Sequence, residues 1–114
     1  MDISFILSKN ELFTLISMMP GRTDAGARFI ELALSGAVLC DLNGLKEKKL
    51  ARIVNDKPEP VSVIRMIADS VSRADSAQLQ DGAWKISSPW ALLRCEACPY
   101  QEGHIRITVI EGCL

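Results

Sequence analysis

The sequence predicts a single α+β domain over residues 1–114, with helices first and an antiparallel sheet with a hairpin after them. Apolar residues recur at helical spacing in the first two thirds of the chain, and from residue 77 onward they alternate as in strands. The composition, 48% hydrophobic and 24% charged, is that of a folded domain. A chain of this length can bury a core without metal or disulfides.

The N-terminal segment carries the clearest local signals. Residues 3–6 predict a short strand, and Ser8 and Glu11 then stand at the spacing of a capping box. Leu7 and Leu12 flank it as a hydrophobic staple. The following helix is predicted to end at the Pro-Gly pair 20–21, and its apolar face consists of Leu12, Leu15, Ile16 and Met19.

The middle of the chain predicts two more helices around a strand. A helix is expected from Thr23 or Asp24 to Ser35, with Gly36 after it, and its apolar circumference predicts a central position. Residues 38–42 predict a strand and residues 43–44 a tight turn. Residues 45–54 predict a short amphipathic helix with the charged run 46–49 outward, and the prolines at 58 and 60 predict a loop.

A further strong helix is predicted from Pro60, since proline is tolerated in the first turn. Its inner stripe comprises Val61, Ile64, Ile67, Ala68 and Val71. Arg65, Asp69 and Arg73 follow at a spacing of four as an exposed charge ladder. Strands are then predicted over residues 83–86, 90–98 and 104–110.

The stretch LLRCEACPYQEGHIRITVI holds a C-x-x-C spacing that can be interpreted as a metal site or as a hairpin. A register that opposes Cys98 with His104 also opposes Leu93, Cys95 and Ala97 with Val109, Ile107 and Ile105 on one face. The other face then pairs Glu96 with Arg106 and Arg94 with Thr108. Because side chains alternate along a strand, Cys95 and Cys98 point to opposite sides, which favours the hairpin.

No metal, cofactor or catalytic site is predicted. Two thiolates must converge on one zinc ion, and there is no second C-x-x-C in the sequence, so a site would need Cys40 and Cys113 brought in by folding. His104 is the only histidine, and the hairpin tip predicts it at the surface. The carboxylates have no spacing typical of a paired acid and base, and no glycine-rich phosphate loop occurs. The chain is therefore expected not to be an enzyme.

The order helix, helix, strand, turn and helix resembles winged-helix domains, which usually bind DNA. In that interpretation TDAGARFIELAL would be the recognition helix, but it offers only Arg28 against Asp24 and Glu31. The net charge of −1 and pI of about 5.8 also give no general attraction to nucleic acid or anionic membranes. A winged-helix DNA-binding regulator is thus the alternative function.

Protein binding is the favoured function. Trp84, Trp90 and Tyr100 all fall in the C-terminal strand region, where aromatic side chains fill a core or flank a sheet edge that binds a partner. These three residues are the candidate partner-binding residues. The acidic N-terminus does not resemble a signal peptide and no apolar segment is long enough to span a membrane, so the location is predicted to be cytoplasmic, with free thiols.

Four consecutive segments resemble one half of the type VII (ESX) secretion-chaperone fold: LSKNELFTLISMMP, SGAVLCDLNGLKEKKLARIV, VSVIRMIADSVSRADSAQLQ and AWKISSPWALLRCEACPYQEGHIRITVI. The resemblance covers nearly the whole chain in order and spacing, although this chain has about half the length expected for that family. It implies a cytoplasmic adaptor that holds small helical secreted proteins, and it implies a homodimer that completes the sheet.

Overall fold

The computed structural model describes residues 3–112 and contains four helices and seven strands. Strand β1 (Ile3–Ser8) leads into α1 (Lys9–Ser17), α2 (Asp24–Ala33) and α3 (Leu42–Glu47). A hairpin of β2 (Ala51–Val54) and β3 (Lys57–Pro60) precedes α4 (Ser62–Ser72). The chain ends with β4 (Ser76–Gln80), β5 (Ala83–Ser87), β6 (Ala91–Ala97) and β7 (His104–Gly112). The predicted α+β class is confirmed, and the winged-helix likeness of the N-terminal part stays a prediction.

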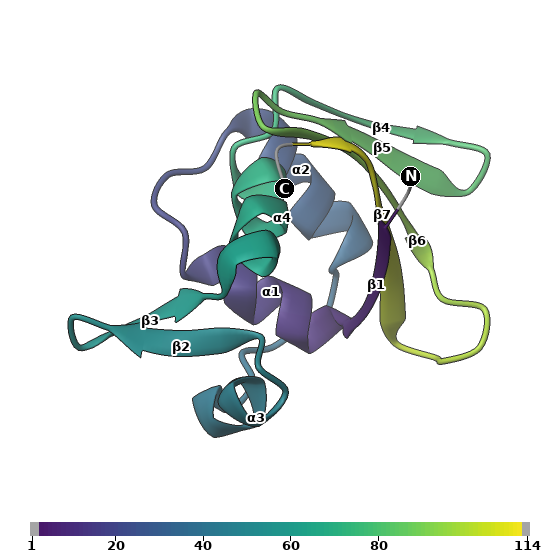
Figure 1. Cartoon of the computed structure of the whole chain (residues 1–114). Helices are drawn as coiled ribbons and strands as arrows, with labels where there is room; N and C mark the ends of the chain where they lie inside the picture. The colour runs from purple at the N-terminus through teal and green to yellow at the C-terminus, as the bar shows by residue number, and fades with distance from the viewer. Residues whose placement is uncertain (1–2, 113–114) are drawn as a thin grey trace.

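Five strands form one antiparallel sheet in the order β1-β7-β6-β5-β4. Helices α1, α2 and α4 lie on one side of this sheet, and the hairpin β2–β3 and α3 project away from it (Figure 1). The first strand therefore pairs with the last, which closes the chain around the core. No helix in the described residues is long and apolar enough to cross a membrane.

The predicted N-terminal signals are confirmed. Ser8 accepts a hydrogen bond from the Glu11 N–H at 3.0 Å, and the Glu11 carboxylate accepts one from the Ser8 N–H at 2.8 Å. Leu7 and Leu12 are both buried, as the hydrophobic staple requires. Leu15 and Ile16 of α1 lie in the core as well. The helix ends at Ser17, earlier than the predicted end at residues 20–21, and Met19 joins the core from the segment after it.

The predicted hairpin register is also confirmed. Leu93, Cys95 and Ala97 oppose Val109, Ile107 and Ile105, while Arg94 and Glu96 oppose Thr108 and Arg106. The Cys98 N–H donates to the His104 carbonyl at 2.9 Å. A β-bulge between Leu92 and Leu93 leaves Ile110 as the extra residue of β7, because Leu92 opposes Glu111 and Leu93 opposes Val109.

Three predictions for residues 38–54 are wrong. Residues 38–42 form no strand: residues 38–41 are a loop and Leu42 begins α3. Side chains of α1 take up the loop's backbone groups, since Asn10 accepts from the Val38 N–H at 3.0 Å and Thr14 from the Cys40 N–H at 2.9 Å. Residues 43–44 lie inside α3, which Asp41 caps, instead of forming a turn. The predicted helix 45–54 ends early, and its second half is strand β2.

The predicted proline loop is strand β3. Asn55 and Asp56 both have positive φ, 50° and 63°, which makes the two-residue turn that joins β2 to β3. An edge strand tolerates Pro58 and Pro60, because their missing N–H groups can face away from the partner strand. Helix α4 consequently begins at Ser62 instead of Pro60. Its inner residues Ile64, Ile67, Ala68 and Val71 are buried, as predicted.

Helix α2 is not the central helix that its composition predicts. It ends at Ala33, two residues earlier than expected, and only Gly26 and Phe29 are buried, while Leu32 is 57% exposed. Gly26 allows α2 to meet the end of α4, since a Cβ there would lie 2.3 Å from the Ser72 carbonyl oxygen. Phe29 packs edge-on against Trp84 of the sheet, with ring centroids 5.4 Å apart.

Candidate functional site

The face of the five-stranded sheet turned away from the helices is the candidate functional site, and it is called the open face below (Figure 1). The residues whose side chains alternate with the buried ones lie on this face, and most of them are polar or charged. From edge to edge they are Ser4, Ile6, Arg106, Thr108, Ile110, Leu92, Arg94, Glu96, Ala83, Lys85, Gln78 and Gln80.

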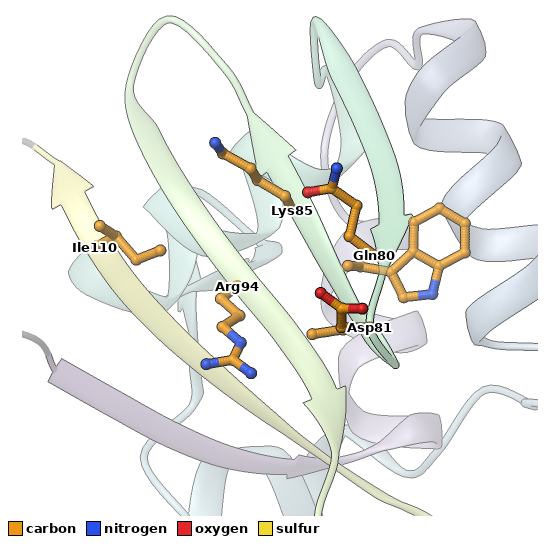
Figure 2. A pocket seen from close by; sticks show the side chains of 7 residues that line it. Gln80, Asp81, Lys85, Arg94 and Ile110 are labelled. Carbon is orange, nitrogen blue, oxygen red and sulfur yellow. The ribbon is translucent and has the colours of Figure 1, made fainter.

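A hollow of about 300 Å³ lies on the open face (Figure 2). Its lining residues are Gln80, Asp81, Ala83, Trp84, Lys85, Arg94 and Ile110. Lys85, Arg94 and Ile110 extend from three neighbouring strands, β5, β6 and β7 (Figure 2). The small Ala83 side chain leaves room between its longer neighbours, and the bulge in β7 places the extra residue Ile110 at the rim.

The hollow is bordered by a pair of like charges. Lys85 lies directly opposite Arg94 in the register of β5 and β6. Two cations at directly opposite positions repel each other and destabilise a sheet. Arg94 is partly compensated by Glu96 at 3.3 Å, whereas Lys85 has no ion-pair partner among residues 3–112. The hollow therefore combines two neighbouring cations with one carboxylate, Asp81, beside an apolar rim.

Glu96 of β6 contacts Arg94, which lines the hollow, and also Arg106 on the neighbouring strand β7. It accepts two hydrogen bonds from Arg106, from Nε at 3.0 Å and from Nη2 at 2.7 Å. The hydrogen bonding and charge of Glu96 raise the pKa of the Arg106 guanidinium above its ordinary value. Arg94 and Arg106 thus share the Glu96 carboxylate, and together with Lys85 they leave this part of the open face positive.

The three aromatic residues predicted to bind a partner lie in different places. Trp84 is buried on the helix side, where Arg28 stands 6.0 Å over its ring, and it also contributes to the lining of the hollow. Trp90, 36% exposed, stacks under Arg73 at 4.5 Å in the loop between β5 and β6. Tyr100 is 87% exposed in the β6–β7 loop, at the opposite end of β6. The structure does not bring these three together.

Cys95 lies in β6, Cys98 directly follows β6, and Cys40 precedes α3. Burial raises the pKa of the Cys95 thiol to about 12, and the Glu96 charge adds to this effect, so Cys95 stays protonated in the core. Cys98 is buried at the hairpin end, and Cys40 lies 3.3 Å from the Thr14 hydroxyl. Cys113 lies outside the described residues. No group of three or more histidine, cysteine or acidic side chains that could hold a metal occurs in residues 3–112.

Sequence reasoning missed the open face because its key residues belong to different strands. Lys85 and Arg94 become neighbours only through the β5–β6 pairing, which was not predicted. Strand β4 was missed as well, although Asp81-Gly82 is a strong hairpin signal and both residues have positive φ, 52° and 78°. His104 is half-buried, and its Nδ1 lies 3.0 Å from the Glu102 carbonyl oxygen.

Comparisons with known proteins identify no relative: no protein-family model, no curated protein and no solved structure matches this chain. The open face and its charges are therefore the basis for a functional proposal.

Proposed function

We propose that this protein is a non-enzymatic, cytoplasmic adaptor that binds a partner protein on the open face of its sheet. The observation that carries the proposal is the repelling pair of Lys85 and Arg94 beside an apolar-rimmed hollow. Such a pair costs stability in the free protein, and an acidic group of a partner would remove that cost. The open face is thus exposed to solvent and would also favour a partner that carries acidic groups.

The shape of the site favours a protein partner over a small molecule. The hollow, at about 300 Å³, stands at the lower end of the volumes typical of small-molecule sites. Around it, charged groups alternate with the apolar side chains of Ile6, Leu92 and Ile110 across the sheet. A mixture of apolar contacts and a polar rim is typical of protein interfaces.

The partner we propose is an amphipathic segment with acidic side chains. Its carboxylates would pair with Lys85 and Arg94, and its apolar side chains would cover Ile110 and Leu92. The resemblance to type VII secretion chaperones makes a small helical secreted protein the first candidate, because a helix can present both kinds of side chain on one face.

Site-specific photo-crosslinking in the cells that produce this protein tests the proposal. A photoreactive residue in place of Gln78, which lies directly opposite Lys85 on the open face, is expected to give a discrete crosslinked protein band. The matched control is the same residue at Leu32, which is 57% exposed on α2 in the helix layer. Crosslinks from position 32 and none from position 78 would mean that the partner binds on the helix side of the sheet, which would contradict this proposal.

DNA binding stays the alternative, and one observation favours it. The hairpin β2–β3 follows α3 as a wing follows its helices, and Lys46, Lys49, Arg52 and Lys57 are exposed on these elements. Exposed cations on a projecting hairpin can contact phosphates. Retention on a heparin column above physiological salt, lost when Arg52 and Lys57 are both replaced by glutamate, would support this alternative.

A further inference from the structure

We propose that β1 is a homodimer interface, at which the β1 strands of two copies pair antiparallel and join their sheets. This strand forms one outer edge of the sheet, since β7 is its only neighbour in the strand order. Its sequence, ISFILS, carries neither charge nor proline, and Ile3 and Ile6 are 38% and 48% exposed. Edge strands that stay unpaired usually carry lysine, proline or a bulge that blocks pairing.

The register of β1 identifies the backbone groups that face outward. The Lys9 N–H donates to the Gly103 carbonyl at 2.9 Å, so this pair is a hydrogen-bonded one. Antiparallel pairs alternate, and Leu7, Phe5 and Ile3 therefore bond to β7. The N–H and C=O groups of Ser4 and Ile6 then point to the free edge.

Two further contacts agree with this assignment. The Ser8 N–H donates to the Glu11 carboxylate at 2.8 Å, which fits a residue whose N–H points away from β7. The hydroxyls of Ser4 and Thr108 lie 3.0 Å apart, which fits a non-hydrogen-bonded pair, where side chains approach more closely. The outward groups of the edge are thus known from three independent contacts.

These outward groups are self-complementary. In an antiparallel pairing centred on Phe5, Ser4 opposes Ile6 of the second copy, and Ile6 opposes Ser4 of the second copy. Both outward residues of each copy then exchange both of their backbone hydrogen bonds. No like charges come to lie opposite each other in the pairing, and Phe5 meets Phe5 of the second copy on the helix side. A second copy of this chain is therefore the occupant that the edge fits best.

The two-fold axis of such a pair stands perpendicular to the sheet. Both open faces consequently lie on the same side and become one continuous surface, while both helix layers lie on the other side. A dimer of this kind would present two copies of the Lys85–Arg94 hollow to the same side.

Light scattering on the full chain at several concentrations tests the interface. Wild type is expected at the mass of two 12.5 kDa chains, and Ile6→Lys at the mass of one, with a dimer dissociation constant raised at least about tenfold. The control is Leu79→Lys on β4, the opposite edge, where Leu79 is 57% exposed. Leu79→Lys should leave the dimer intact.

A wild type with the mass of one chain at every concentration would overturn the proposal, as would a dimer that Leu79→Lys dissociates and Ile6→Lys does not. If Ile6→Lys does not fold, amide hydrogen exchange on wild type tests the interface instead. The Ser4 and Ile6 amides should exchange more slowly as the protein concentration rises. Exchange rates of these amides that do not change with concentration would contradict pairing at β1. Crosslinking at position 78 tests the open face separately, so either proposal can fail alone.

Discussion

The two faces of the five-stranded sheet are built from alternating residues of the same strands, and they carry opposite chemistry. On the helix side, Leu93, Cys95 and Ile107 are at most 1% exposed and carry no charge. On the open face their direct neighbours in sequence include Arg94, Glu96 and Arg106, and Lys85 repels Arg94. The residues of the helix side stabilise the fold by burial, whereas the repulsion between Lys85 and Arg94 on the open face does not stabilise it.

Leucine-to-alanine changes at two adjacent positions should show the largest difference between the faces. Leu93→Ala removes a fully buried side chain and should lower the free energy of unfolding by about 2–5 kcal/mol. Leu92→Ala, on the open face, should change it by less than about 1 kcal/mol. Urea unfolding measures both, and equal losses would mean that the open face is packed as tightly as the core.

The second comparison is between two glutamates. Burial alone would raise the pKa of Glu11, but hydrogen bonds from Lys48, at 2.6 Å, and from the Ser8 N–H lower it below 4.5 overall. A carboxyl with a lowered pKa in the folded state stabilises the fold above pH 4.5 and loses this effect as the pH falls through the folded-state pKa.

Glu11→Gln should therefore lower the free energy of unfolding by about 1 kcal/mol at pH 7, since the capping box is weakened. The difference from wild type should shrink below pH 4.5. Glu96→Gln, in the ion pairs of the open face, serves as the comparison and should cost less at pH 7 because its partners Arg94 and Arg106 are partly exposed. Thermal unfolding across pH 3–7 measures both variants.

The smallest expected effect is a gain in stability, at Lys85. Lys85→Glu replaces a repelling cross-strand pair with an attractive one and should raise the free energy of unfolding by roughly 0.5 kcal/mol. The gain should shrink in high salt, because these side chains are exposed to solvent. Lys85→Gln is the matched control, with about half the gain. A loss of stability in Lys85→Glu would show that the pair does not repel.

The sequence was most informative where one local pattern decided the structure. The capping box at Ser8 and Glu11 and the apolar stripe of α4 depend on neighbours in sequence, and both were predicted. The β6–β7 register was also predictable, because a short loop left one alignment that satisfied both faces.

Prediction failed where contacts distant in sequence decided the structure. Residues 38–42 look like a strand by composition, but hydrogen bonds to Asn10 and Thr14 of α1 hold residues 38–41 as a loop, and Leu42 begins α3. The site was missed for a related reason. The pairing of Lys85 with Arg94 depends on how β5 aligns with β6, and neither residue stands out in the sequence alone.

The most direct test of the open face as a binding surface is partner crosslinking from position 78 in the presence and absence of Lys85→Glu. If an acidic partner segment binds there, the charge reversal should reduce the crosslinked product about tenfold, which corresponds to about 1.4 kcal/mol of binding free energy. The fold should remain as stable as wild type or slightly more so. An unchanged yield of crosslinked partner would contradict the proposed role of the open face.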